Sequence, residues 1–393
     1  MKAKARGKKR NIPYFKPTIE KEEIDEVVNA LKSGWVTTGP RTKKFEEKFK
    51  KYIGSKHAVA VSSCTAALHV GLVVAGVKEG DEVITTPYTF AATAEVICYL
   101  KAKPVFVDIK EDTYNIDADK IEEKITSRTK AILPVHYGGQ PCDMDKILAI
   151  AKKHSLKVIE DAAHAVGAEY KGKKIGLFGD VTAFSFYATK NMTTGEGGMA
   201  TFENDEYADK MQVLSLHGLS QDAWKRYSAE GSWYYEIIMA GYKYNMTDIQ
   251  AALGLCQLKK LERFNKRRER LAEMYNQEFS KIKELSLRKI KDGVKNVWHL
   301  YTIRIDESKL RINRNQFIKE LAKKGISTSV HFIPLHLHPY YQQKHGHKKG
   351  DFPVAEKVYS NLISLPLYPD LGEDDVNYII DSVKEIIKQN QRF

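Results

Sequence analysis

The stretch SFYATKNMTTGEGG, residues 185–198, is the part of this sequence that decides the fold. It continues a strand-like run, 181–186, into a turn that holds one lysine, Lys190, and three closely spaced glycines. Glycines let a backbone approach a ligand closely because they carry no side chain. A lysine in such a turn is typical of an amine that must attack a bound aldehyde. The alternative interpretation is an ordinary lysine on a surface loop.

A second predicted strand, 156–161, ends in Asp161 and is followed by Ala163 and His164. A carboxylate at one strand end and a lysine after the next strand are what pyridoxal phosphate chemistry requires. We expect Asp161 to face the pyridine nitrogen, Ala163 to let the ring lie flat against it, and His164 to meet the ring hydroxyl. The alternatives are a helix cap for Asp161 and a core histidine for His164.

Further candidates follow other predicted strands. Ser63, Cys64 and Thr65 stand in a turn between a strand and a helix, where backbone N–H groups can point at a phosphate, and Ser185 can donate to the same group. Phe90 is expected on the far face of the cofactor ring. Ordinary turn polarity and core packing are the alternatives for these residues. Tyr88 and His136 also fall at strand ends.

The coarse pattern is α/β. Strands are predicted at 57–61, 82–86, 104–108, 130–136, 156–161, 181–186 and 198–202, and helices at 19–33, 42–53, 66–75, 92–101, 117–125, 144–154 and 206–216. Alternation of this kind implies parallel strands joined by right-handed crossovers. Ligands of such sheets bind beyond the carboxyl ends of the strands, which is where the candidate residues fall.

Three regions are predicted along the chain: a basic flexible tail at 1–12, a large cofactor-binding domain at 13–250, and a long linking helix with a small C-terminal domain at 251–393. In helix 19–33, the apolar residues Ile24, Val27, Val28 and Leu31 share one face. Thr247 is a candidate N-cap for the long helix, which runs to about 280. The small α+β domain is expected to contain a strand at 298–305, a helix at 314–325, a short strand at 327–332 and a helix at 373–388.

Composition excludes several classes of protein. The chain has 393 residues, a net charge of +13 and no apolar run of about 18 residues, so we expect no membrane-spanning helix. No secretory signal is recognised, and four scattered cysteines without a CxxC pair favour the reducing cytoplasm. The basic N-terminus suggests a nucleic-acid-binding arm, but no aromatic residue interleaves with it. We expect no nucleic-acid partner, and attribute the charge to attraction of phosphorylated ligands.

A histidine-rich segment near the C-terminus is a candidate metal site. It contains His331, His336, His338, His345 and His347, interrupted by two prolines and without carboxylate or cysteine at ligand spacing. The prediction is therefore no metal, and a polar loop that contacts the substrate or a subunit interface.

Seven segments together resemble one known family. They are 34–40 (GWVTTGP), 63–68 (SCTAAL), 89–93 (TFAAT), 160–164 (EDAAH), 185–198, 241–245 (GYKYN) and 364–369 (SLPLYP). These are similar to the pyridoxal-phosphate-dependent nucleotide-sugar aminotransferases of the DegT/DnrJ/EryC1/StrS type. The resemblance covers about 12 to 390. It implies the aspartate-aminotransferase fold (fold type I), with a large domain built on a mostly parallel sheet and a smaller α+β C-terminal domain.

The resemblance also implies roles for individual residues. Lys190 forms the Schiff base, Asp161 holds the ring nitrogen, His164 lies by the ring oxygen, and Ser185 with the backbone of Cys64 and Thr65 holds the phosphate. Asn245 is a phosphate contact given by the other subunit, which implies a homodimer with shared sites. Trp35, Thr38, Tyr88 and His331 are assigned to the substrate. The family usually has glycine where this chain has Cys64, and a dehydratase branch has histidine at the position of Lys190.

The implied reaction moves an amino group from L-glutamate to a keto nucleotide sugar. Segments 245–250 (NMTDIQ) and 330–336 (VHFIPLH) look most like the branch that aminates C4 of UDP-linked sugars, such as UDP-4-keto-pentose. GDP-4-keto-6-deoxymannose and UDP-4-keto-6-deoxy-HexNAc are alternative substrates. A non-enzymatic nucleic-acid-binding protein on the same scaffold is the alternative of a different class.

Overall fold

A computed structural model describes residues 10–220 and 234–392. Residues 1–9 of the predicted tail, 1–12, lie outside the described residues. Ile12 is buried, and it exchanges backbone hydrogen bonds with Gly325 and Ser327. The N-terminal segment is therefore part of the fold by residue 12.

The centre of the molecule is a seven-stranded sheet in the order β1-β9-β8-β5-β4-β2-β3. Its strands are β1 (His57–Val61), β2 (Glu82–Thr85), β3 (Lys103–Phe106), β4 (Thr129–Ile132), β5 (Lys157–Asp161), β8 (Val181–Ser185) and β9 (Gly198–Phe202). β2, β3, β4, β5 and β8 pair in parallel, which confirms the predicted mostly parallel sheet.

β9 departs from the alternating pattern because it is antiparallel to both β8 and β1. No crossover helix separates β8 from β9, and the connection between them is the loop that carries Lys190. A parallel pairing needs a long crossover connection. The short Lys190 loop therefore reverses the chain, and β9 runs back alongside β8.

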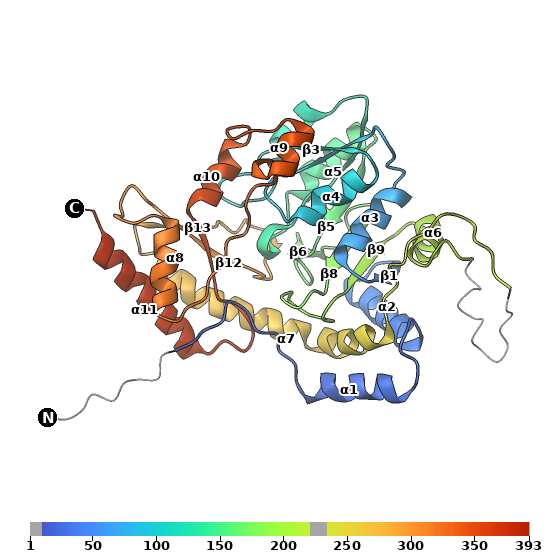
Figure 1. The fold of residues 1–393 in the computed structure, drawn as a ribbon, viewed down its shortest axis with the longest axis horizontal. Coiled ribbons are helices and arrows are strands. Elements are labelled where there is room, and N and C mark those ends of the chain that lie inside the picture. Colours follow the sequence, from blue (N-terminus) through green and yellow to red (C-terminus); the bar gives the residue numbers. More distant parts are fainter. Residues whose placement is uncertain (1–9, 221–233, 393) are drawn as a thin grey trace.

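Helices cover both faces of the sheet (Figure 1). α3 (Cys64–Val74), α4 (Ala91–Tyr99) and α6 (Asp205–Ser215) share one apolar cluster, and α2 (Pro40–Ile53) and α5 (Met144–Lys153) share another with the start of the long helix. The helix predicted at 117–125 is wrong. Two 3-10 turns, Ala118–Lys120 and Glu122–Lys124, stand there, the second with no buried residue. Ala118 and Ile121 are nevertheless buried in the core, so this segment packs against the large domain without forming a continuous α-helix.

The long helix α7 (Asp248–Phe279) begins at the predicted cap, where Thr247 and Gln250 form a capping box. It runs beneath the large domain into the small one (Figure 1). The small domain has the sheet β10-β12-β13, covered by α7 and two further helices. Its elements are β10 (Leu285–Leu287), β12 (Tyr301–Ile305), α8 (Arg314–Lys323), β13 (Leu362–Leu365) and α11 (Glu373–Asn390).

The remaining elements are short. A small three-stranded sheet joins β6 (Glu169–Tyr170), β7 (Lys173–Lys174) and β11 (Val294–Lys295), and α9 (Pro339–His345) and α10 (Pro353–Asn361) lie between β12 and β13. The strand predicted at 327–332 does not form. Only Ser329 bridges to Ser364 there, because the chain then turns toward the large domain. None of the helices in the described ranges is long and apolar enough to cross a membrane.

Helix α1 (Lys21–Lys32) presents its apolar face outward. Ile24 is 56% exposed and Leu31 is 52% exposed, whereas Glu23 is fully buried. Both carboxylate oxygens of Glu23 accept from Lys260 Nζ at 2.8 Å, and Gln257 donates to one of them. The helix is therefore attached to α7 through polar contacts, and most of its predicted apolar stripe remains exposed. Figure 1 shows α1 at the edge of the molecule.

Candidate active site

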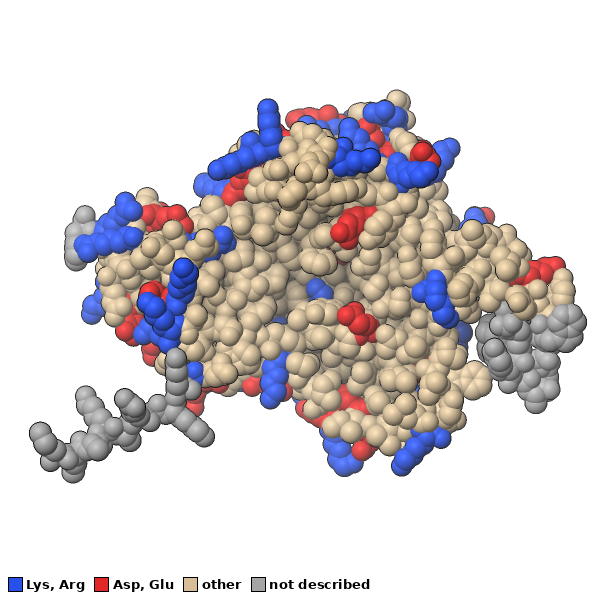
Figure 2. Space-filling model, in the orientation of Figure 1, with Lys and Arg blue, Asp and Glu red and all other residues tan. Residues whose placement is uncertain are grey.

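A cavity of about 580 Å³ lies at the carboxyl ends of β5 and β8. It brings together ten of the residues selected from the sequence: Ser63, Cys64, Thr65, Phe90, Asp161, Ala163, His164, Ser185, Lys190 and His331. Figure 2 shows a hollow in the middle of this face, with most of the charged side chains around its periphery. Residues from at least five separate segments therefore converge on one recess.

Lys190 stands in the β8–β9 loop, where its backbone N–H donates to the Tyr187 carbonyl at 2.9 Å. Burial lowers the pKa of the Lys190 amine from 10.5 to about 8, and the nearby charge of Asp161 opposes this effect. The ammonium form is poorly solvated in the cavity, so the neutral amine is much more accessible than in a surface lysine. This is the condition that a lysine nucleophile needs.

Asp161 ends β5 and is held by two donors. Thr93 Oγ1 donates to Asp161 Oδ2 at 2.8 Å, and the Ala163 N–H donates to Oδ1 at 3.1 Å. Burial raises the pKa of the Asp161 carboxyl, while these hydrogen bonds and the charge of Lys190 oppose the rise. Thr93 in turn contacts Thr89 Oγ1 at 2.7 Å. A buried carboxylate with few protein donors can accept a further bond from a cationic ring nitrogen.

The N-terminus of α3 faces the same cavity. Ser63 caps this helix by accepting from the Ala66 N–H at 3.1 Å. The N–H groups of Cys64 and Thr65, the first helical residues, have no acceptor within the helix, and the helix dipole favours an anion there. Ser185 lies across the cavity with its hydroxyl accepting from the Tyr187 N–H. These groups fit a phosphate.

The Cys64 side chain leaves this turn open. Its Sγ contacts the Ala183 carbonyl oxygen at 3.5 Å, on the sheet side of the helix. Burial raises the pKa of the thiol well above its usual value, so the group is a neutral thiol. Gly198 at the start of β9 completes the turn. A Cβ on Gly198 would lie 2.4 Å from the Ser63 carbonyl carbon and 2.6 Å from the Cys64 nitrogen.

Three histidines line the cavity: His164, His299 and His331. Burial lowers the pKa of each imidazole, to about 4 for His331, and the charge of Lys190 acts in the same direction. His164 and His299 have ring centroids 4.2 Å apart. His299 was missed from the sequence, because it falls at the start of a predicted strand and no motif marks it.

Phe90 and Ala163 both contribute to the cavity wall. Phe90 is the N-cap residue of α4 and is 65% exposed, so its ring is accessible from the cavity. Phe332 lies near it, with centroids 6.3 Å apart, and was not selected from the sequence.

Tyr88 does not line the cavity. It is fully buried, and its hydroxyl donates to the His331 carbonyl at 2.8 Å. The Tyr137 hydroxyl donates to the same carbonyl at 2.6 Å. The expected direct contact of Tyr88 with substrate is therefore corrected: its contact is with the backbone of the segment that carries His331. His136 is also buried beneath the site, paired with Glu160 at 2.9 Å.

Trp35, Thr38 and Asn245 lie outside the Lys190 cavity of their own chain. Asn245 Nδ2 donates to Thr38 Oγ1 at 2.7 Å, and both residues line a separate small hollow. The Trp35 indole donates to the Thr38 carbonyl at 2.9 Å. These three residues thus contact one another and do not line the Lys190 cavity.

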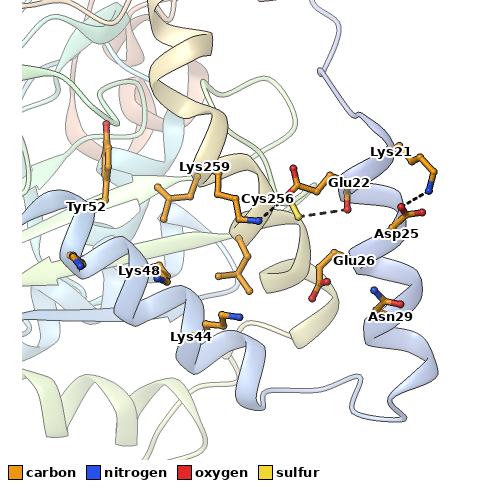
Figure 3. Close-up of a pocket in the computed structure, with 13 residues that line it drawn as sticks. Lys21, Glu22, Asp25, Glu26, Asn29, Lys44, Lys48, Tyr52, Cys256 and Lys259 are labelled. Carbon is orange, nitrogen blue, oxygen red and sulfur yellow. Dashed lines mark hydrogen bonds and ion pairs between the residues drawn. The ribbon is translucent and has the colours of Figure 1, made fainter.

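A surface groove and the histidine-rich segment are two other candidate binding sites. A groove of about 680 Å³ lies between α1, α2 and α7, but Lys21, Asp25, Glu22 and Lys259 on its walls neutralise one another in ion pairs (Figure 3). In the histidine-rich segment, His336 pairs with Glu356. Throughout the part of the chain that the structure describes, no group of three or more His, Cys, Asp or Glu side chains could hold a metal.

A lysine of lowered pKa, a buried carboxylate and a helix N-terminus in one recess define a pyridoxal-phosphate enzyme. Comparison with known proteins agrees: residues 17–384 match the DegT/DnrJ/EryC1/StrS aminotransferase family, and the chain belongs to it. It is a pyridoxal-phosphate-dependent aminotransferase with the fold-type-I architecture.

Three similar proteins illustrate the family. Protein MJ1066 of Methanocaldococcus jannaschii is 61% identical over 97% of this chain and 98% of its own. The spore coat polysaccharide biosynthesis protein SpsC of Bacillus subtilis is 54% identical over 97% of this chain and 98% of its own. The PLP form of Spr1654 of Streptococcus pneumoniae, described as a sugar aminotransferase, is 38% identical, with a TM-score of 0.90 over 97% of this chain and 99% of that one.

Proposed function

We propose that this enzyme moves an amino group from L-glutamate to a keto sugar carried on a nucleotide, at C4 of a UDP-linked 4-keto sugar. The observation that carries the proposal is the presence of Lys190 and Asp161 in one cavity with an anion-binding helix terminus. The names of SpsC and Spr1654 support a sugar as the amino acceptor. The net charge of +13 favours a phosphorylated substrate.

The residues of the chain have separable roles in this reaction. Pyridoxal phosphate supplies an aldehyde and an electron-withdrawing ring. Lys190 would hold the aldehyde and, once displaced by the incoming amine, would move a proton at the reacting carbon through Nζ. Asp161 would keep the ring nitrogen protonated, since Thr93 and the Ala163 N–H fix its carboxylate. The start of α3 and Ser185 would hold the phosphate.

The active unit is proposed to be a homodimer. Ile237 and Ile238 are 68% and 55% exposed on an arm in which Leu219 bridges to Ile237 and Leu216 to Lys243 (Figure 1). Exposed apolar residues on an arm and along α1 indicate a surface that a partner covers. A second copy would bring its Asn245 and neighbouring Thr38 to the Lys190 cavity, and His331 would meet the sugar nucleotide from the same chain.

The test has two stages. Purified protein with cofactor should absorb near the visible region typical of a lysine-bound aldehyde, borohydride should fix this link, and Lys190→Ala should abolish it. A coupled assay with L-glutamate across UDP-, GDP- and dTDP-linked keto sugars then identifies the acceptor. Turnover of GDP-4-keto-6-deoxymannose or UDP-4-keto-6-deoxy-HexNAc alone would replace the proposed substrate. Cofactor binding without any turnover would reject the substrate class.

A further inference from the structure

His299 lines the cavity and contacts both His164 and Asn191. It follows Trp298 at the entrance to β12, is 7% exposed, and lies against His164 with ring planes 32° apart. Its Nδ1 is 3.2 Å from Asn191 Oδ1. Asn191 is the residue directly after Lys190, so His299 touches two parts of the site at once.

The orientation of the Asn191 amide follows from its partners. Asn191 Nδ2 is 2.8 Å from the Val297 carbonyl oxygen and 2.7 Å from Asn265 Oδ1. A backbone carbonyl only accepts, so the amide group facing Val297 must be the NH₂. Asn265 is fixed in the same way, because its own Nδ2 donates to the Val166 carbonyl at 3.2 Å. Asn191 therefore presents an oxygen to His299.

The tautomer of His299 follows. Because Asn191 Oδ1 only accepts, His299 Nδ1 must carry a proton. Burial and the nearby charges of Lys190 and Arg268 lower the pKa of His299 well below its usual value, so the ring is neutral. A neutral ring with a proton on Nδ1 has none on Nε2, which is therefore an acceptor.

His164 has the opposite tautomer. Its Nδ1 accepts from the Gly138 N–H at 3.2 Å, so the proton of the neutral ring is on Nε2. Burial, with the charges of Lys190 and Arg288, keeps the pKa of His164 well below its usual value. The Gly138 turn is itself held by Arg288, whose guanidinium donates to the Tyr137 and Gly138 carbonyls.

We propose that His299 is a positioning residue for the transamination: its ring packs on His164 and holds that imidazole as a neutral Nε2–H donor toward the cofactor's ring oxygen, while its Nδ1–H fixes Asn191 and with it the chain beside Lys190. Two imidazoles at this separation cannot both carry charge at low cost. His164 thus remains a hydrogen-bond donor and not a cation. The role toward the ring oxygen rests on the proposed function, whereas the tautomers do not.

The first test uses protein without cofactor. Proton-coupled nitrogen NMR of the ¹⁵N-histidine-labelled protein at pH 7 reports which nitrogen of each imidazole is protonated. We expect Nδ1–H for His299 and Nε2–H for His164, assigned with His299→Gln and His164→Gln. The same tautomer in both rings, or a doubly protonated ring at pH 7, would overturn the proposal. This experiment is independent of the sugar and of turnover.

The second test separates the two contacts. His299→Phe keeps the ring against His164 and loses the donor to Asn191, whereas His299→Gln keeps an N–H donor and loses the ring. With cofactor bound, His299→Phe should lower kcat of the glutamate half-reaction roughly tenfold with KM within about twofold, and should shift the pH midpoint of the cofactor's absorption band. His299→Gln should recover part of kcat because it restores a donor to Asn191, and no recovery would overturn the role assigned to that contact.

The control is His154→Gln, a half-buried histidine paired with Glu122 and outside the lining of the cavity. It should match the wild type in absorption and in kcat. Thermal unfolding and cofactor content show whether each variant is folded. Folded His299 variants with wild-type absorption midpoint and kcat would overturn the positioning role. Loss of cofactor chemistry in the wild type itself would instead reject the proposed function and leave the tautomer result standing.

Discussion

At the scale of single residues, the reactivity of the site depends on two buried groups of opposite charge, Lys190 and Asp161. Burial lowers the pKa of Lys190 to about 8, and Asp161 opposes that shift. The same pair acts in reverse on Asp161, where burial raises the pKa and Lys190 opposes the rise. Each group therefore limits how far its neighbour departs from its ordinary ionisation.

This balance predicts a pH dependence. In cofactor-free protein, labelling of Lys190 by an acylating reagent should increase as the pH rises through about 8, because only the neutral amine reacts. Asp161→Asn removes a charge that stabilises the ammonium, so the midpoint should move to lower pH. Mass spectrometry of the labelled peptide measures it, with Lys259 as the internal control because Glu22 raises its pKa. An unchanged or higher midpoint in Asp161→Asn would contradict the prediction.

Gly198 provides a prediction about the phosphate end of the cavity. In Gly198→Ala the added methyl would meet the Ser63 carbonyl and the Cys64 nitrogen closer than non-bonded atoms approach, so the turn must shift. Because that turn supplies the N–H donors, the Kd for pyridoxal phosphate should rise on the order of tenfold or more, equivalent to about 1.4 kcal/mol. Fluorescence titration measures it.

Gly372→Ala is the matched control for this substitution. Its Cβ would make only an ordinary contact, 3.6 Å from Asp375 Oδ2, at the N-cap of α11. Cofactor affinity in this variant should equal that of the wild type. Equal affinity in Gly198→Ala as well would show that the turn tolerates the methyl and that the phosphate does not depend on it.

At the scale of elements, α2 is capped by a side chain from another helix. Its N-cap is Gly39, which has no capping side chain. Asp248, the first residue of α7, accepts instead from the N–H groups of Gly39, Arg41 and Thr42 at 2.8–3.0 Å, and from the Thr42 hydroxyl. A carboxylate at a helix N-terminus is favoured by the dipole and by these unpaired donors. One buried side chain thus joins the starts of two helices.

Asp248→Ala should therefore be strongly destabilising. Removing a fully buried carboxylate leaves three backbone donors without an acceptor, and we expect a loss of about 2–4 kcal/mol in the free energy of unfolding. Urea denaturation followed by circular dichroism measures it. Asp381→Ala, at an exposed position of α11, is a control of the same chemistry. A loss below about 0.5 kcal/mol in Asp248→Ala would show that solvent replaces the cap.

At the scale of the whole molecule, apolar side chains are exposed on the outer face of α1 and on the arm that carries Ile237. Thr38 and Asn245 are separated from Lys190 within one chain. The proposed homodimer would account for both observations, because burial of the apolar surfaces would supply association energy and symmetry makes each contact occur twice.

Shared sites can be tested by complementation. Lys190→Ala and Asn245→Ala should each be inactive alone. After the two are unfolded together and refolded, about one quarter of the wild-type activity should return, because half of the dimers are mixed and each mixed dimer has one intact site. If Asn245 served the cavity of its own chain, both sites of a mixed dimer would be defective and no activity would return. A different affinity tag on each variant, followed by purification over both tags in turn, shows that mixed dimers form.

The sequence by itself determined the class of fold, most of the strands and helices, and the residues around Lys190. It could do so because strand–turn–helix punctuation places Ser63, Asp161 and Ser185 at strand ends, and the ends of neighbouring parallel strands meet. The direction of β9, the outward face of α1 and the position of Tyr88 were decided by tertiary structure. Each depends on what lies opposite in space: the Lys190 loop, the Lys260 ammonium that binds Glu23, and the His331 backbone. The local sequence pattern shows the periodicity of a helix or a strand. Whether a side chain is buried or exposed depends on residues from distant parts of the chain.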